Sequence, residues 1–328
     1  MQKLVFFGRS NFQYNGFDSM RILLNDVIHD EDFYYVDPQH NLAFNWLNYF
    51  YMDRIGTAIK KRIGVPLRTQ AFREYTQHFK RISKDDEVSF VFVRYEPWFF
   101  GSDGYLNWLK KEYPKSQLIY LLINVNQYLG IDFEHFCPYF DRVITIDEGD
   151  AEKYGLEFHP FFYSAIDKED LSIPESDCFY VGNAKERLKD LLAVYELLTA
   201  RGLKCDFHIV GVPEEQQKHR DSIAYNRPLD YDEIVCRVKR SKMLLEIMQE
   251  GQTSGTLREH EAVVYGKKLI TNNQYIVNRS FYTPENIFVF ESAKDIDYDF
   301  IHSAPIAEYP NKELISPRSL IKYLSENH

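Results

Sequence analysis

The chain has 328 residues, of which 45% are apolar and 27% charged, so it is long and apolar enough for two folded domains and is not a disordered protein. Its formal net charge of −10 argues against bulk binding to nucleic acid. The four cysteines form no C-x-x-C pair, which favours neither a disulfide framework nor a zinc site and indicates a reducing cytoplasm. We find neither a signal peptide nor an uninterrupted apolar run of about 18 residues.

The first half of the chain alternates short apolar runs with helix-length segments. This alternation predicts an α/β domain with a parallel sheet and helices on both faces, which we assign to residues 1–160. A first helix is expected after Gly16 and another over Asp103–Tyr113. The expected strands are Lys3–Phe7, Phe33–Val36, Val88–Arg94, Gln117–Asn124 and Arg142–Ile146.

Residues 54–81 combine eight basic residues and one acidic residue with apolar and aromatic side chains at helical spacing. Basic amphipathic helices of this kind lie on anionic lipid, so the segment predicts peripheral contact with a membrane. A solvated helix pair packed on the sheet explains the same pattern. Both interpretations stay open at this point.

A second series of strands and helices predicts another Rossmann-like domain over residues 178–310, after an aperiodic linker at 161–177. Residues 311–328 are expected to hold a helix that returns to the first domain, with Ser316-Pro317 at its start. The expected helices are Lys185–Ala200, Asp230–Lys239 and Gly255–Tyr265. The expected strands are Cys178–Val181, Asp206–Val210, Met243–Ile247, Lys268–Thr271 and Ile287–Phe290.

The segment 249–273 has the strongest functional signal. A strand leads into a loop of small and hydroxyl residues, and a helix then runs to Gly266. Small residues let backbone N–H groups approach an anion, and the helix start adds a partial positive charge. The segment therefore predicts a phosphate site, although any α/β sheet can contain such a helix start. The residues of the predicted site are Thr253, Ser254, Gly255, Thr256 and Arg258.

The parts of this pattern are the loop, then Glu261-Ala262, Gly266 and the apolar pair Leu269-Ile270. The pattern resembles the C-terminal half of GT-B glycosyltransferases, especially those of bacterial surface polysaccharide synthesis. The resemblance implies two Rossmann-like doubly wound domains facing a cleft, with the donor nucleotide on the second domain and its ribose on Glu261. Many retaining members have a further Glu where this chain has Thr253. The sequence therefore leaves open whether transfer inverts or retains configuration.

The turns after the first two strands of the second domain complete the expected nucleotide site, because ligands bind at the carboxyl edge of open α/β sheets. Gly182 permits a tight turn, and Asn183 and Lys185 follow it. In the related enzymes a cation here stabilises the departing nucleoside diphosphate. We favour Arg187 because a guanidinium contacts phosphate at two points, with an exposed helix-start charge as the alternative. Gly211 lies in the turn expected to border the base.

Glycosyl transfer with inversion requires a group that takes the proton of the acceptor hydroxyl. Glu96, just after a strand, and Asp18 are the candidates, and an ion pair of Glu96 with Arg94 is the structural alternative. Three Asp-x-Asp patterns, at 30–32, 295–297 and 297–299, resemble loop or helix starts more than metal ligands. We therefore expect neither a metal nor another cofactor, and fixed donors and cations must neutralise the departing phosphate.

These features predict a metal-independent glycosyltransferase that moves a sugar from a nucleotide-sugar donor, most simply UDP-linked, to a saccharide hydroxyl. The acceptor is expected to be a saccharide or lipid-linked oligosaccharide of capsule or lipopolysaccharide synthesis, at the inner face of the cell membrane. Two alternatives remain. One is a nucleotide-sugar 2-epimerase on the same scaffold, and the other is a non-catalytic binding subunit.

Overall fold

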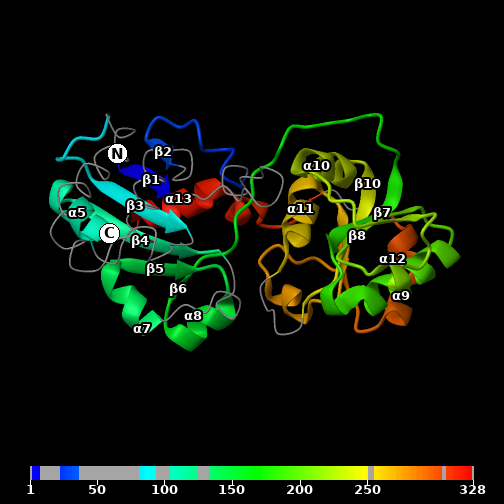
Figure 1. The fold of residues 1–328 in the computed structure, drawn as a ribbon. Helices are drawn as coiled ribbons and strands as arrows, with labels where there is room; N and C mark the ends of the chain where they lie inside the picture. The colour runs from blue at the N-terminus through cyan, green and yellow to red at the C-terminus, as the bar shows by residue number, and fades with distance from the viewer. Residues whose placement is uncertain are drawn as a thin grey trace. The chain divides into compact units, whose positions relative to one another are not determined.

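The computed structural model describes residues 2–7, 23–36, 81–93, 104–123, 133–249, 255–304 and 308–326. The chain divides into two compact units (Figure 1). The first contains Met1–Phe161 together with Leu320–His328, and the second contains Phe162–Ser319. In the described ranges, no helix has the length and apolar character needed to cross a bilayer.

The described part of the first unit contains one parallel sheet of six strands in the order β2-β1-β3-β4-β5-β6. The five strands predicted from the sequence are present with bounds shifted by at most two residues, and their predicted ends Arg94 and Asn124 lie outside the described residues. The short strand β6 was not predicted. The bounds are β1 Lys3–Phe7, β2 Phe33–Val36, β3 Val88–Val93, β4 Ser116–Leu122, β5 Arg142–Thr145 and β6 Glu157–Phe158, with helices α5 Gly104–Glu112, α7 Phe133–Phe136 and α8 Glu148–Tyr154.

The second unit likewise has a parallel sheet, with six described strands in the order β12-β11-β10-β7-β8-β9. The sequence predicted all of these strands except β9, which has three residues and is followed by Asn226-Arg227-Pro228. The bounds are β7 Ser176–Asn183, β8 Cys205–Val210, β9 Ile223–Tyr225, β10 Ser241–Glu246, β11 Lys268–Thr271 and β12 Ile287–Val289, with helices α9 Leu188–Ala200, α10 Tyr231–Lys239, α11 Leu257–Tyr265 and α12 Tyr298–His302.

Both faces of this second sheet are covered, which is why its strands read as continuous apolar runs. Successive side chains of β7 point to opposite faces, so Tyr180 joins a core with α9 and α12, whereas Phe179 joins a core with α10 and α11. The same alternation occurs in β10, where Leu245 faces the α9 side and Leu244 the α11 side. The doubly wound α/β architecture predicted from the sequence is confirmed.

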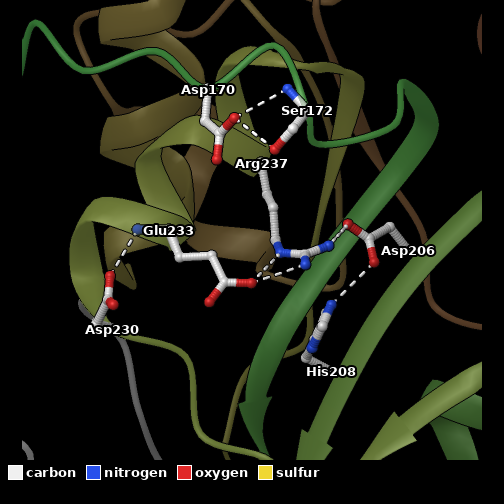
Figure 2. A network of polar contacts seen from close by, with 7 residues as sticks. All are labelled: Asp170, Ser172, Asp206, His208, Asp230, Glu233 and Arg237. Atoms are coloured by element: carbon white, nitrogen blue, oxygen red, sulfur yellow. Dashed lines mark hydrogen bonds and ion pairs between the residues drawn. The ribbon is translucent and has the colours of Figure 1, made fainter.

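Helix α10 is fastened to strand β8 by a network of charged side chains (Figure 2). Arg237 donates from Nη1 to Asp206 Oδ2 at 2.7 Å and from Nη2 to Glu233 Oε1 at 2.8 Å. The Nε2 atom of His208 lies 2.9 Å from Asp206 Oδ1. Asp230 caps the helix by accepting a hydrogen bond from the Glu233 backbone N–H at 2.8 Å, and the helix predicted over Asp230–Lys239 begins here.

The last helix, α13 (Pro317–Glu326), begins in the second unit, and its residues from Leu320 onward belong to the first unit. The Tyr323 hydroxyl donates to Glu157 Oε2 at 2.9 Å, and Arg142 Nη2 donates to the same oxygen at 2.6 Å. The Arg142 guanidinium also lies 5.1 Å from the centre of the Tyr323 ring. These contacts fasten the end of the chain to β5 and β6.

Candidate functional site

The strand order of the second unit reverses between β7 and β10. Strands β7, β8 and β9 follow one another to one side, and β10, β11 and β12 to the other. Helix α9, which follows β7, packs on one face of the sheet, and α11, which follows β10, packs on the opposite face. The connections therefore leave β7 and β10 in opposite directions. In open parallel sheets, ligands bind outside the carboxyl ends of the strands at such a reversal.

Two basic side chains from the turn after β7 reach the end of β10. Lys185 donates from Nζ to Oε1 of Gln249, and Arg187 donates from Nη1 to the carbonyl oxygen of Ile247 at 2.7 Å. The predicted residues Lys185 and Arg187 are thus brought together at the reversal point. Their helix differs from the prediction, because Lys185–Arg187 form a 3-10 turn and α9 begins only at Leu188.

Arg187 is a buried cation that is held by carbonyl groups. Its residue exposure is 9%, Nη1 donates to Ile247 O, and Nη2 donates to Asn183 O. Its buried Nε has no hydrogen-bond partner among the residues that the structure describes. Among the same residues, no carboxylate lies within ion-pair distance of this guanidinium. The exposed helix-start charge considered as the alternative is therefore wrong, because the Arg187 side chain is buried.

Two glycines lie close to the end of β7. Gly182 lies within β7, not in the predicted tight turn, and a Cβ there would lie 2.7 Å from the Tyr180 hydroxyl oxygen. A Cβ on Gly211 would lie 2.7 Å from Oδ1 of Asn183, and Gly211 has a φ of 76°, which favours glycine. Asn183 Oδ1 accepts from the Lys185 N–H at 3.2 Å. Lys185 itself has a φ of 43°, a conformation that is uncommon for a residue with a side chain and is frequent at functional sites.

Glu246, the last residue of β10, was not predicted from the sequence to lie in the site. This carboxylate is 1% exposed and accepts from the Thr256 backbone N–H at 2.8 Å and from the Thr271 hydroxyl at 2.7 Å. Thr256 in turn caps α11 by accepting from the Arg258 N–H at 3.1 Å. Glu246 therefore fixes the start of α11 against β10 and β11. The signal available in the sequence was an acid directly after the apolar run Met243–Leu245.

Gly255 lies against a second buried acid. A Cβ on Gly255 would lie 1.8 Å from the carboxyl carbon of Glu259, so a larger residue would require the Glu259 carboxylate to move. Glu259 is 2% exposed, and its carboxylate oxygens lie 3.8 Å from Arg279 Nε and 3.5 Å from Asn273 Nδ2. The glycine is explained by close packing. Its role as a phosphate donor stays a prediction.

Arg258 and Glu261 form a buried ion pair inside α11. Their side chains are 9% and 0% exposed, Arg258 Nη2 donates to Glu261 Oε1 at 2.7 Å, and Nη1 lies 2.5 Å from Oε2. Tyr231 also donates to Glu261 Oε1, at 3.0 Å. Burial raises the pKa of Glu261, while Arg258 and Tyr231 oppose that rise. Protein encloses the carboxylate in this conformation, and the ribose contact implied by the resemblance stays a prediction.

His260, which lies between Arg258 and Glu261 in the sequence, should make the stability of the folded protein depend on pH. Burial lowers its pKa from 6.5 to about 3. The unfolded chain therefore binds a proton at higher pH than the folded chain, and stability falls as the pH drops from 6.5 towards 3. Between pH 7 and pH 5 this residue should remove about 2 kcal/mol from the free energy of unfolding. Urea titrations at both pH values should show that His260→Gln lacks this loss of stability, whereas a variant of an exposed histidine, His219→Gln, keeps it. The same change in the free energy of unfolding with pH in both variants would contradict the prediction.

The turn expected to border the base is occupied by a side chain of the protein. Val212 donates its N–H to Asn226 Oδ1 at 3.0 Å, and its carbonyl accepts from Asn226 Nδ2 at 2.8 Å. The Val212 backbone therefore has its polar groups paired. A base contact in this turn would have to use other atoms.

Several predicted residues lie outside the described part of the chain. These are the candidate bases Glu96 and Asp18, the loop residues Thr253 and Ser254, and all of the basic segment except Arg81. In the first unit the strand order reverses between β1 and β3.

The Asp-x-Asp patterns in the second unit act as helix caps, as their positions predicted. Asp295 accepts from the Ser292 N–H at 2.9 Å, and Asp297 accepts from the Phe300 N–H at 2.6 Å. Within the ranges described above, no group of three or more His, Cys, Asp or Glu side chains is arranged to hold a metal ion.

Comparison with known proteins gives no match to a protein-family model or to a curated protein. Among solved structures, a Listeria monocytogenes protein described as a UDP-N-acetylglucosamine 2-epimerase matches over 100% of this chain and 97% of its own, with a TM-score of 0.50 and 11% identity. The chain has the GT-B fold.

Two further structures have lower TM-scores. An α-glucosyltransferase in complex with UDP-glucose and DNA matches over 100% of this chain and 91% of its own, with a TM-score of 0.49 and 12% identity. The Gap123 glycosylation-associated complex of Streptococcus agalactiae matches over 79% of this chain, which spans 55% of that chain, with a TM-score of 0.43 and 13% identity. At 11% identity the likeness to the Listeria monocytogenes protein shows the fold alone, and the activity has to be argued from the residues.

Proposed function

We propose that this GT-B chain is a metal-independent glycosyltransferase that moves a sugar from a UDP-linked donor to a saccharide hydroxyl in surface polysaccharide synthesis. The observation that carries the proposal is Arg187, a buried guanidinium anchored by the carbonyls of Asn183 and Ile247 at the strand-order reversal. Within the described part of the chain this cation is oriented by carbonyls, which contribute no net charge, and no carboxylate pairs with it.

The chemistry of this cation suits a pyrophosphate. A guanidinium has five N–H donors, and the carbonyls of Asn183 and Ile247 occupy two of them. Among the described residues no carboxylate pairs with this guanidinium, and we propose that the phosphate of the ligand supplies the negative charge. Lys185 lies in the same turn, and the start of α11 lies beyond β10 at the same sheet edge. Nucleoside diphosphates are the common ligands of such an edge.

In the proposed reaction the bond between the anomeric carbon of the sugar and the phosphate oxygen breaks, and the acceptor oxygen forms a new bond to that carbon. The nucleoside diphosphate is the leaving group. Arg187, with Lys185 and Asn183, stabilises the charge that develops on the departing phosphate. Thr253, Ser254, Gly255, Thr256 and Arg258 surround the phosphates at the start of α11. Glu96 or Asp18 takes the proton of the acceptor hydroxyl.

The acceptor we propose is a saccharide or a lipid-linked oligosaccharide at the inner face of the cell membrane. The support is the basic composition of residues 54–81, which suits an anionic lipid surface. Vesicles that contain anionic lipid should then retain the protein at low salt and release it at high salt.

A nucleotide-sugar 2-epimerase is the second candidate. Such an enzyme needs acids near the sugar, and three buried acids, Glu246, Glu259 and Glu261, gather around the start of α11. Each of them is hydrogen-bonded or ion-paired within the protein, which favours structural roles and leaves transfer as the leading proposal.

A thermal-shift screen against nucleoside diphosphates tests the site, and incubation with donor sugars tests the reaction. We expect UDP to raise the melting temperature and sugar transfer to require an added saccharide. Conversion of the donor to its 2-epimer without an acceptor would support the second candidate. If no nucleoside diphosphate shifts the melting temperature, both enzymatic proposals fail and a non-catalytic subunit is favoured.

A further inference from the structure

A chain of buried hydroxyl groups leads from the start of the second unit to the ion pair in α11. Tyr163 lies two residues after the boundary at Phe161 and is 2% exposed. Its hydroxyl oxygen is 2.6 Å from that of Tyr231 on α10, which is 3.0 Å from Oε1 of Glu261. Glu261 holds Arg258, the second residue of α11.

The direction of these hydrogen bonds follows from the donors available. An ionised carboxylate only accepts, and a hydroxyl has one hydrogen to donate. When Glu261 is ionised and paired with Arg258, Tyr231 donates to Glu261 and Tyr163 donates to Tyr231. Each group in the chain therefore orients the next, and the guanidinium of Arg258 stands at its end.

Arg187 and Arg258 both contact β7, and Arg187 does so at the carbonyl of Asn183, the last residue of the strand. The Arg258 guanidinium lies 5.8 Å from the centre of the Phe179 ring. Burial raises the pKa of the neighbouring Tyr180 phenol, and the charges of Arg187 and Arg258 both lower it. The Tyr180 hydroxyl is buried and has no hydrogen-bond partner in the described ranges. Both cations thus lie along β7, where Phe179 and Tyr180 point to opposite faces of the sheet.

We propose that Tyr231 and Tyr163 are positioning residues that orient Glu261, and through it Arg258, toward the pyrophosphate of the ligand. The inference rests on the proposed function and adds to it that Glu261 serves the phosphates, not the ribose. A buried polar chain of this length is poorly explained by stability alone, since well-packed apolar residues stabilise an interior as well or better.

Tyr265 provides a matched control. Its hydroxyl accepts a hydrogen bond from the Ile166 N–H at 3.0 Å, so it also joins α11 to the segment that follows the unit boundary. Its ring packs against Tyr163 with centres 6.2 Å apart. No hydrogen bond joins it to Glu261 in the described residues. Tyr265→Phe therefore removes a similar contact without touching the chain to Arg258.

Calorimetry with UDP and with inorganic pyrophosphate tests the inference. We expect Tyr231→Phe to lower the affinity for both ligands by about 10-fold, and Tyr163→Phe to lower it by about 3-fold. Tyr265→Phe should change neither by more than about 2-fold. Loss confined to UDP would place Glu261 on the ribose and overturn the inference, as would equal effects of Tyr231→Phe and Tyr265→Phe.

The pH dependence of binding gives a readout that a packing defect would not move. The groups that face Glu261 are Arg258 of its own helix, Tyr231 of α10 and, through Tyr231, Tyr163. Loss of the Tyr231 donor should raise the pKa of Glu261, so pyrophosphate affinity should begin to fall at a higher pH than in the wild type. An unchanged profile overturns the inference. A wild type that binds neither UDP nor pyrophosphate removes the proposed function itself, and this inference falls with it.

Discussion

Arg187→Ala is expected to reduce the affinity for UDP by about 100-fold, equal to roughly 2.7 kcal/mol. The guanidinium is held by the carbonyls of Asn183 and Ile247, so no reorganisation is needed when the phosphate arrives. Loss of the side chain removes both the charge and the oriented donors. Calorimetry at fixed ionic strength measures the effect.

Two further variants separate ligand binding from damage to the fold. Lys189→Ala removes an exposed charge two residues along the chain and should leave UDP affinity within about 2-fold of the wild type. Arg187→Lys keeps the charge but cannot donate to both carbonyls and to phosphate. Its affinity for UDP should therefore lie between those of Arg187→Ala and Lys189→Ala. If Arg187→Ala folds and binds UDP like Lys189→Ala, the phosphate does not lie at this residue.

Glu261→Ala is expected to lower the free energy of unfolding by about 3–5 kcal/mol, because it leaves the Arg258 guanidinium buried without its anion. The Arg258 and Glu261 side chains are 9% and 0% exposed, so solvent cannot replace the lost partner without rearrangement. Urea denaturation at neutral pH measures the loss. If the free energy of unfolding falls with urea concentration as steeply in the variant as in the wild type, the folded state keeps its compactness.

Two matched variants test the electrostatic cause. Arg258→Met should cost less than Glu261→Ala, because an abandoned carboxylate can take up a proton whereas a guanidinium stays charged. The double variant Arg258→Met/Glu261→Leu should recover most of the stability, since it leaves no buried charge. A double variant as unstable as Glu261→Ala would assign the loss to packing.

The sequence predicted the strands well and the side-chain contacts poorly, and the reason is physical. Strands such as Lys268–Thr271 are buried on both faces, so their apolar runs are visible without knowledge of their neighbours. Strand β9 has three residues and no such run, and it exists because β8 provides a pairing edge. Gly182 was expected to form a turn, but its requirement comes from the nearby Tyr180 hydroxyl.

The sequence by itself determined the doubly wound α/β class and the helix starts at Asp230 and Asp297. These features depend on residues near one another in the chain, so local patterns specify them. Only the tertiary structure decided that Arg187 is anchored by a carbonyl 60 residues away and that Tyr231, 30 residues before Glu261, donates to its carboxylate. A charged residue has the same identity whether it is exposed or buried, and the fold alone determines which groups surround it.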